Sequence, residues 1–462
     1  MTQMQQTKQM SNATQTTATW DTLVVGLGAT GLSVARYLAE KGKDFAVTDS
    51  RQSPPSEDKL RQSYAAVPTY FGGFDSKVFT QAKCLVVNPG VAVAIPEIQQ
   101  AKHNGAEIIG DIELFAREAQ APVVAITGSN GKTTVTTLLQ LMAEKSGCKA
   151  QTGGNIGTPA LDLLEAKNTE LFILELSSFQ LETTPSLKTA TAVVLNICED
   201  HLDRYESLEH YAETKGTIYN NCQQLIVNRD DAVVVALAKD KPFISFGLDE
   251  PATGHYGLRN KENKVWLAKG DDCLLDVATM KLRGKHNQAN ALAALAMGEA
   301  VGLQQSAMLE VLTEYAGMEH RTQWLAEIDE VNWYNDSKGT NVGATLAALE
   351  GLGGPIVVIL GGQGKGADFF PLQKAIKNNA RAVVLMGEDA DAIADVLDAV
   401  VPEHRVASMM DAVELAAGIA QAGDKVLLSP ACASFDMFVN YQARGNEFMQ
   451  SVKAYEKAKG GI

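Results

Sequence analysis

The residues that could do the most definite chemistry form a glycine-rich stretch, residues 127–134, with the sequence TGSNGKTT. An apolar run at residues 123–126 precedes it and an amphipathic run at residues 135–144 follows it, which predicts a strand, a loop and a helix. In such a loop the backbone N–H groups bind phosphate, Lys132 reaches the β and γ oxygens, and the Thr133 hydroxyl can bind Mg²⁺. The stretch therefore predicts a site for ATP or GTP. Its predicted contacts are Gly128, Asn130, Gly131, Lys132, Thr133 and Thr134.

Carboxylates follow two further apolar runs in the middle of the chain. The run at residues 171–174 ends at Glu175, and the run at residues 192–197 leads into the segment EDHLDR, which contains His201. An acid at the end of a strand beside a phosphate loop is where Mg²⁺ bridging the β- and γ-phosphates is held. Glu175 is therefore a predicted metal ligand. A single histidine such as His201 is more often structural, so composition alone gives it no role.

A second glycine-rich stretch, residues 26–31, lies near the start of the chain and has the sequence GLGATG. It follows the apolar run at residues 22–25, and Asp49 ends the next run at the distance typical of a ribose-binding acid. Taken alone, this pattern favours a dinucleotide-binding oxidoreductase. The pattern is only moderately specific, because it indicates a tight turn, and such a turn can bring the pyrophosphate of many different ligands to a helix N-terminus. A chain that also has a triphosphate loop needs a different explanation for this turn.

The elements that must position these residues alternate along the whole chain. Short apolar, β-branched runs are followed by segments of helical periodicity, which is typical of parallel sheets with crossover helices. We predict an α/β fold with three domains, at residues 21–110, 111–318 and 319–462, preceded by a polar tail rich in Gln and Thr at residues 1–20.

Charge and cysteine usage narrow the class of partner. Forty Lys and Arg against 55 Asp and Glu give a net charge of −15, which argues against nucleic acid and anionic membranes as partners. The six cysteines lack metal-binding spacing, which indicates a reducing compartment. No apolar run is long enough to span a bilayer. We expect a cytoplasmic protein without membrane insertion, acting as a monomer.

The phosphate loop departs from the generic pattern in an informative way. Ile126 stands where the first glycine of G-x-x-x-x-G-K-[ST] belongs, and Gly128 comes two residues later. The variant T-G-S-N-G-K-T-T resembles the signature of the Mur ligase and folylpolyglutamate synthetase superfamily, which uses ATP to join an amino acid to a carboxylate. The resemblance covers nearly the whole chain after about residue 20. It implies Rossmann-like first and last domains and a central P-loop domain of the ATPase type with a parallel sheet.

Within the Mur ligases the chain is similar to the D-glutamate-adding members, through residues 26–33 and 49–51. The resemblance implies three substrates, UDP-N-acetylmuramoyl-L-alanine, D-glutamate and ATP, and a role in making peptidoglycan precursors. In this family the first domain binds the UDP part of the UDP-sugar. The chain lacks the D-N-P-R element of ligases that add a dibasic amino acid. The implied UDP-sugar contacts are Ala29, Thr30, Ser50, Arg51, Asn155 and His201.

The resemblance also implies a metal site and the catalytic residues. Two Mg²⁺ ions are implied, with Mn²⁺ as an alternative, and Lys215 matches the lysine that CO₂ converts to a carbamate in this family. Without the resemblance, Lys215 would be interpreted as a surface charge. The implied metal ligands are Thr133, Glu175, His201 and Lys215, and the implied catalytic residues are Lys132, Glu175, His201 and Lys215.

The remaining contacts implied by the resemblance concern the nucleotide and the amino acid. Asn287 and Asn290 match amides that bind adenine, although their spacing is also that of helix caps. Arg321 and Asp336 match residues that bind the phosphates and the ribose. Lys365 is equally consistent with a solvated loop lysine. The implied D-glutamate contacts are Lys338, Thr340, Lys365, Ser434, Phe435 and Tyr441.

The expected reaction is phosphorylation of the L-alanine carboxylate to an acyl phosphate, which the amine of D-glutamate then attacks. Three ligands brought together by three domains imply hinge closure, expected near residues 318–321. Three other functions stay open at this point. They are another Mur-type or folylpolyglutamate-type ligase, an NAD-dependent oxidoreductase, and a UDP-sugar sensor with a catalytically dead ATPase site.

Overall fold

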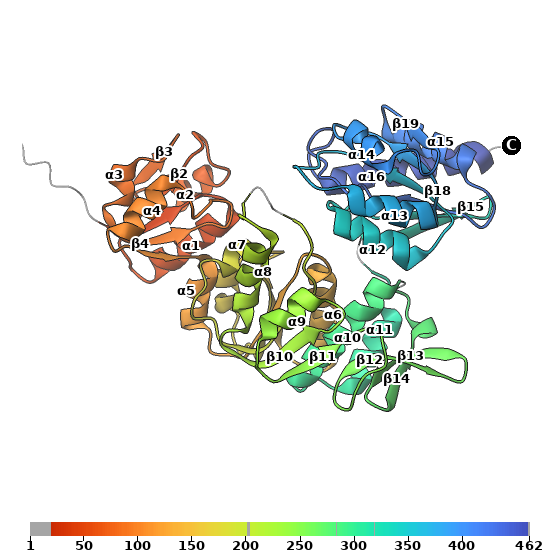
Figure 1. Ribbon diagram of the computed structural model, residues 1–462. Helices are drawn as coiled ribbons and strands as arrows, with labels where there is room; N and C mark the ends of the chain where they lie inside the picture. Colours follow the sequence, from red (N-terminus) through yellow and green to blue (C-terminus); the bar gives the residue numbers. More distant parts are fainter. Residues whose placement is uncertain (1–19, 201–203, 283, 318, 461–462) are drawn as a thin grey trace, which may run out of the picture. The chain divides into compact units, whose positions relative to one another are not determined.

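The structure is a computed structural model, and it describes residues 20–200, 204–282, 284–317 and 319–460. Within these residues the strands form three sheets, each flanked by helices (Figure 1). The predicted α/β class with parallel sheets is therefore confirmed. The chain divides into two compact units, one ending at Leu114 and one beginning at Phe115.

The first unit contains a parallel sheet whose central strand is buried along most of its length. β1 has only Asp21 exposed, as expected for a strand covered on both faces by crossover helices. In sheet order, the described strands are β3 (Thr69–Phe71), β2 (Phe45–Asp49), β1 (Trp20–Val25), β4 (Ala82–Val87) and β5 (Glu107–Ile109). The helices are α1 (Ala29–Glu40), α2 (Glu57–Ser63), α3 (Ser76–Phe79), α4 (Pro96–His103) and α5 (Asp111–Glu118), which continues into the second unit.

The first sheet of the second unit contains the phosphate loop. Its parallel part runs from β7 to β12, and β13 and β14 extend the edge as antiparallel strands. In sheet order, the described strands are β14 (Asp272–Asp276), β13 (Lys264–Lys269), β12 (Tyr256–Lys261), β11 (Phe243–Phe246), β10 (Cys222–Asn228), β9 (Thr189–Val194), β6 (Val123–Thr127), β8 (Leu171–Glu175) and β7 (Ala150–Gly154). Its helices are α6 (Lys132–Lys145), α7 (Ser178–Leu181), α8 (Leu208–Gly216), α9 (Ala232–Ala238), α10 (Lys285–Ala300) and α11 (Gln305–Glu314), with short 3₁₀ turns at Ala160–Glu165, Thr217–Tyr219 and Val277–Thr279.

The last sheet is parallel except at one edge, where β15 and β16 form an antiparallel pair. In sheet order, its described strands are β15 (Gln323–Ile328), β16 (Val331–Asn335), β20 (Lys425–Leu428), β17 (Ile356–Leu360), β18 (Ala380–Leu385) and β19 (Glu403–Arg405). The helices are α12 (Val342–Leu352), α13 (Phe370–Asn379), α14 (Ala390–Leu397), α15 (Met409–Ile419) and α16 (Tyr441–Gly460). Two buried apolar clusters, one on each face, hold these helices against the sheet.

The predicted order of strand, phosphate loop and helix is confirmed, but α6 begins at Lys132, three residues earlier than the amphipathic run predicts. Two glycines allow the loop to turn tightly into the start of α6. A Cβ on Gly128 would lie 3.0 Å from the Cβ of Leu195, and a Cβ on Gly131 would lie 2.5 Å from the Oδ1 of Asn290. Both glycines also have positive φ, which disfavours other residue types. The first turn of the helix is therefore built from the loop itself.

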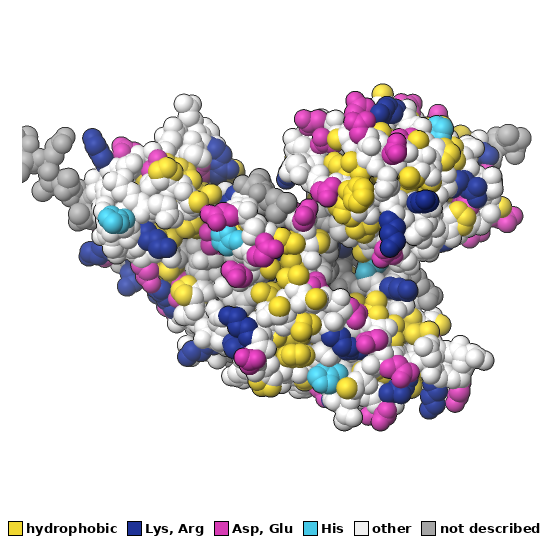
Figure 2. Space-filling model, viewed as in Figure 1, with side chains coloured by type: hydrophobic (Ala, Val, Ile, Leu, Met, Phe, Trp, Pro, Cys, Tyr) yellow, Lys and Arg dark blue, Asp and Glu magenta, His cyan; other side chains and the backbone are white. Residues whose placement is uncertain are grey.

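The surface carries mixed charge, with acidic and basic side chains interspersed on the face drawn in Figure 2. Among the helices of the described residues, none is long and apolar enough to cross a membrane.

Candidate active site

The phosphate loop is held by the end of the neighbouring strand. The Asn130 N–H donates to the Asn196 Oδ1 at 2.8 Å, and the Asn196 side-chain amide donates back to the Asn130 carbonyl at 3.1 Å. The Ser129 N–H donates to the Asn196 carbonyl at 2.9 Å. Sequence analysis missed Asn196 as a site residue, although its position after an apolar run could have indicated it. The loop is thus preformed for phosphate.

Lys132 folds over this loop. Its Nζ donates to the carbonyl oxygens of Gly128, at 2.7 Å, and Ser129, at 2.8 Å. Burial lowers the pKa of Lys132, and the carboxylates of Glu175 and Asp200 act in the opposite direction. The ammonium group is therefore at the loop and faces acidic groups, where it can move to the oxygens of a bound triphosphate.

Glu175 is the last residue of β8, as the sequence predicts, and its side chain is buried. Its Oε1 accepts from the Asn155 side-chain amide at 2.9 Å, whereas its Oε2 has no hydrogen-bond partner among the described residues. A buried carboxylate oxygen without a donor is unfavourable unless a cation binds it. No group of three or more His, Cys, Asp or Glu side chains that could hold a metal occurs in the described part of the chain. His201, predicted to be a further ligand, lies outside the described residues.

Lys215 is not a surface charge. The residue lies on α8, is 2% exposed, and its Nζ is 3.4 Å from the Thr127 Oγ1 and 4.7 Å from the centre of the Tyr211 ring. Burial lowers the pKa of Lys215 well below its ordinary value, and the positive charge of Lys132 lowers it further. A buried lysine in this setting favours the neutral amine, which is the nucleophilic form.

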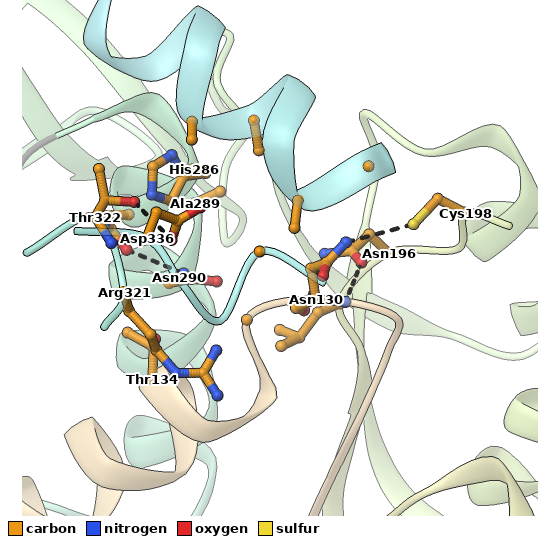
Figure 3. Close-up of a pocket in the computed structure, with 18 of the residues that line it drawn as sticks. Asn130, Thr134, Asn196, Cys198, His286, Ala289, Asn290, Arg321, Thr322 and Asp336 are labelled. Atoms are coloured by element: carbon orange, nitrogen blue, oxygen red, sulfur yellow. Dashed lines mark hydrogen bonds between the residues drawn. The ribbon is translucent and has the colours of Figure 1, made fainter. Parts of the chain in front are cut away.

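A pocket of about 340 Å³ opens beside the phosphate loop. Figure 3 shows Asn130, Asn196 and Cys198 at one end and His286, Thr322 and Asp336 at the other. Its walls are mostly apolar, which suits a flat nucleobase. The apolar lining residues include Leu195, Phe246, Leu248, Leu282, Ala289, Ala347 and Ala348.

Two predicted adenine contacts line this pocket. The Asn290 side-chain amide donates to the Asn287 Oδ1 at 3.2 Å. Neither residue is the N-cap of α10, because Gly284 holds that position. Sequence analysis missed His286, which also lines the pocket and whose Nδ1 lacks a hydrogen-bond partner within the described residues. The only signal for His286 was its place directly before Asn287.

Asp336 and Arg321 connect this pocket to the last sheet. The Asp336 carboxylate accepts from the Ser429 hydroxyl at 2.7 Å and from the Thr322 N–H at 2.9 Å, and burial raises its pKa to about 6. The Arg321 guanidinium donates to the Thr133 Oγ1 at 2.6 Å. The structure therefore places Arg321 at the phosphate loop and Asp336 at the end of this pocket away from Asn196. Thr134 also lines the pocket.

A second pocket of about 720 Å³ shares part of its lining with the first. Four of the predicted D-glutamate contacts lie in its wall, together with Lys132, Thr133, Asn155 and Glu175. Those four are Lys338, Thr340, Lys365 and Tyr441.

The other two predicted D-glutamate contacts do not line this larger pocket. They are Ser434 and Phe435, which are absent from the described residues that form its lining. Ser434 is buried, and Phe435 is 63% exposed with the Lys365 Nζ 5.5 Å from its ring centre. The Lys338 Nζ lies 4.1 Å from the centre of the Tyr441 ring, and burial lowers the pKa of Lys338 to about 8.

Four of the six predicted UDP-sugar contacts lie at the carboxyl ends of β1 and β2 in the first unit. Ala29 and Thr30 begin α1, and Ser50 and Arg51 directly follow β2. The Arg51 guanidinium donates to both Asp49 carboxylate oxygens, at 2.9 and 2.7 Å. The Leu27 N–H of the glycine turn also donates to Asp49, at 2.7 Å. Asp49 therefore organises Arg51 and the turn, which is a different use from binding a ribose.

Family models match three parts of the chain. The model described as Mur ligase MurD-like, N-terminal domain matches residues 20–110. The Mur ligase middle domain matches residues 126–298, and the Mur ligase glutamate ligase domain matches residues 320–432.

Curated relatives match nearly the full length. The UDP-N-acetylmuramoylalanine–D-glutamate ligase of Nitrosococcus oceani is 51% identical over 434 residues, which cover 93% of this chain and 96% of that protein. The ligase of the same name from Pseudomonas putida is also 51% identical, with the same coverage.

Solved structures share the fold at low sequence identity. A pseudomurein peptide ligase type C from Methanothermus fervidus has a TM-score of 0.59 and 17% identity, covering 94% of this chain and all of that one. The UDP-N-acetylmuramate-alanine ligase of Thermotoga maritima has a TM-score of 0.58 and 20% identity with the same coverage.

Proposed function

The chain belongs to the Mur ligase family, and we propose that its two connected pockets carry out the two chemical steps of an amide ligase. The protein is an ATP-dependent ligase that adds D-glutamate to UDP-N-acetylmuramoyl-L-alanine in peptidoglycan synthesis. The observation that carries the proposed mechanism is the larger pocket, which Lys132, Glu175, Lys338 and Lys365 all line. Phosphoryl transfer and amino-acid capture can therefore occur in one continuous space.

In the first step, an oxygen of the L-alanine carboxylate attacks the γ-phosphorus of ATP, and the bond from that phosphorus to the β–γ bridging oxygen breaks. An acyl phosphate and ADP result. Lys132 and Arg321, both at the phosphate loop, stabilise the charge that develops on the transferred group. The adenine occupies the smaller pocket beside Asn287 and Asn290, and Asp336 lies where the ribose is bound.

In the second step, the amine nitrogen of D-glutamate attacks the acyl carbon, and the tetrahedral intermediate releases phosphate and a proton to give the amide. The acyl phosphate is already activated, so the protein contributes mainly positioning and electrostatics. Lys338 lines both pockets and stabilises the departing phosphate. Lys365 and Thr340 hold the side-chain carboxylate of D-glutamate, with Tyr441 as a wall and with Ser434 and Phe435 next to the pocket.

The reaction depends on Mg²⁺, and the residues present fit such an ion. The unpartnered Oε2 of Glu175 and the hydroxyl of Thr133 provide the oxygen ligands that Mg²⁺ prefers. When bound, Mg²⁺ neutralises phosphate charge and polarises the transferred group. We assign a second ion to His201.

The buried amine of Lys215 fits conversion to a carbamate. The neutral nitrogen attacks the carbon of CO₂, a C–N bond forms as one C=O π bond breaks, and one proton is released, so that the amine becomes a negatively charged, carboxylate-like ligand. An ammonium group would repel Mg²⁺, whereas a carbamate oxygen attracts it. The low pKa that burial imposes on Lys215 supports this modification, because only the unprotonated amine reacts.

We divide the chain into domains at residues 21–110, 111–318 and 319–462. The UDP-sugar is assigned to the first of these domains. Its proposed contacts in that domain are Ala29, Thr30, Ser50 and Arg51. Asn155, also predicted from the resemblance, donates its side-chain amide to the proposed metal ligand Glu175. The use of Asp49 to hold Arg51 argues against the oxidoreductase alternative.

Lys365→Ala tests the amino-acid site. The D-glutamate carboxylate would lose a charge-assisted hydrogen bond worth on the order of 1.5–3 kcal/mol, so the KM for D-glutamate should rise about 10- to 100-fold while the KM for ATP stays unchanged. Steady-state phosphate release measures both constants. Lys377→Ala, at an exposed lysine of α13 in the same domain, is the control. An unchanged KM for D-glutamate in the Lys365 variant would place the pocket elsewhere.

A further inference from the structure

Asp389 occupies the N-cap position of α14 but does not cap that helix. Aspartate at an N-cap usually accepts a hydrogen bond from the second or third backbone N–H of its own helix. The Asp389 side chain makes no such bond in the described structure. Its Oδ2 instead accepts from the Gly364 N–H at 2.6 Å. Ser408 shows the usual arrangement in the same domain, because its side chain accepts from the Asp411 N–H of α15.

The segment that Asp389 holds carries Lys365. Lys365 has a φ of +55°, in the left-handed region that residues with a Cβ rarely adopt. Gly364 directly precedes it and Gly366 follows it, so the backbone on both sides is permissive. A lysine in this conformation needs fixed neighbours if its side chain is to point in one direction.

Two contacts fix the start of this segment. Gln363 and Ala433 exchange backbone hydrogen bonds, each of 2.9 Å, which ties the segment to the loop after β20, next to Ser434. The Asp389 N–H donates to the Gly362 carbonyl at 3.0 Å while its carboxylate accepts from Gly364. Asp389 therefore holds the backbone on both sides of Gln363, up to the residue before Lys365.

We propose that Asp389 is a positioning residue for the amino-acid substrate, acting through the Gly364 N–H on Lys365. The 2.6 Å hydrogen bond from the Gly364 N–H to the Asp389 Oδ2 fixes the backbone directly before Lys365. Asp389 does not itself line the pocket that the described residues form. Its effect is to keep the Lys365 ammonium preorganised for the D-glutamate side-chain carboxylate. The inference rests on the proposed placement of D-glutamate at Lys365.

Asp389→Ala should raise the KM for D-glutamate about 5- to 20-fold and leave the KM for ATP unchanged. This is less than the effect expected for Lys365→Ala, because Asp389 acts on the substrate only through the backbone next to Lys365. Asp389→Asn keeps an acceptor oxygen and should recover most of the affinity. Ser408→Ala is the matched control, because it removes a true helix cap from the same domain. It should lower the Tm without changing the KM for D-glutamate. An Asp389→Ala variant that behaves like Ser408→Ala would overturn the inference.

A double variant separates this inference from the proposed function. If Asp389 acts through Lys365, adding Asp389→Ala to Lys365→Ala should produce no further rise in the KM for D-glutamate. If the two substitutions instead raise the KM independently, so that their fold-changes multiply, the inference about Asp389 is wrong while the proposed amino-acid site still holds. If Lys365→Ala alone leaves the KM unchanged, both the proposed amino-acid site and the role of Asp389 are wrong.

Discussion

Replacing Lys132 by alanine should abolish turnover while leaving UDP-sugar binding nearly intact. The Lys132 ammonium lies on the phosphate loop and lines the same pocket as the Glu175 carboxylate, where we propose that phosphoryl transfer occurs. Removing one preorganised charge of this kind costs at least about 10²- to 10³-fold in kcat. Because we assign the UDP-sugar to the first domain, its affinity, measured by calorimetry, should change little.

Lys145→Ala is the matched control for this experiment. Lys145 ends the same helix, α6, but its side chain forms surface ion pairs with Glu310 and Glu314 at 2.6 and 3.0 Å. Exposed pairs contribute little to stability, so this variant should retain normal turnover. Phosphate release at the wild-type rate by Lys132→Ala would reject the assignment of the phosphate loop.

Lys215→Ala should lose most activity, and acetate should restore part of it. If the carbamate on Lys215 supplies an oxygen ligand to Mg²⁺, its removal should lower turnover by at least about 10- to 100-fold. A short carboxylic acid can enter the space left by the side chain and provide an equivalent oxygen. The measurement is turnover of the variant with and without acetate at fixed ionic strength.

Two comparisons make the rescue specific. Acetate should not restore Lys132→Ala, because that variant lacks a positive charge rather than an oxygen ligand. Full activity of Lys215→Ala without acetate would mean that the buried amine has no part in catalysis. Loss of activity that acetate does not relieve would contradict the carbamate role.

Much of the fold could be predicted from periodicity, because parallel strands buried on both faces are continuous apolar runs. The runs at residues 123–126 and 171–174 became β6 and β8. The antiparallel edge formed by β13 and β14 was not predicted. These strands are only partly buried, so their apolar pattern is weak. The start of α6 was also misplaced, since its first turn consists of polar loop residues.

The site residues could be predicted only where a short continuous stretch of sequence indicates their function. The phosphate loop and Glu175 follow from residue types and spacing alone. Lys215 does not, because its burial and low pKa arise from packing of α8 against distant segments. Asp389 was missed for a similar reason, since its partner Gly364 is 25 residues away in the sequence.

The most direct test of the account follows oxygen from substrate to product. UDP-N-acetylmuramoyl-L-alanine labelled with ¹⁸O in its L-alanine carboxylate is incubated with ATP, Mg²⁺ and D-glutamate, and the released phosphate is analysed by mass spectrometry. An acyl-phosphate mechanism transfers one carboxylate oxygen to each phosphate, so we predict singly labelled phosphate, formed much faster with D-glutamate than with L-glutamate or L-lysine. Unlabelled phosphate, or release that does not depend on D-glutamate, would contradict the account.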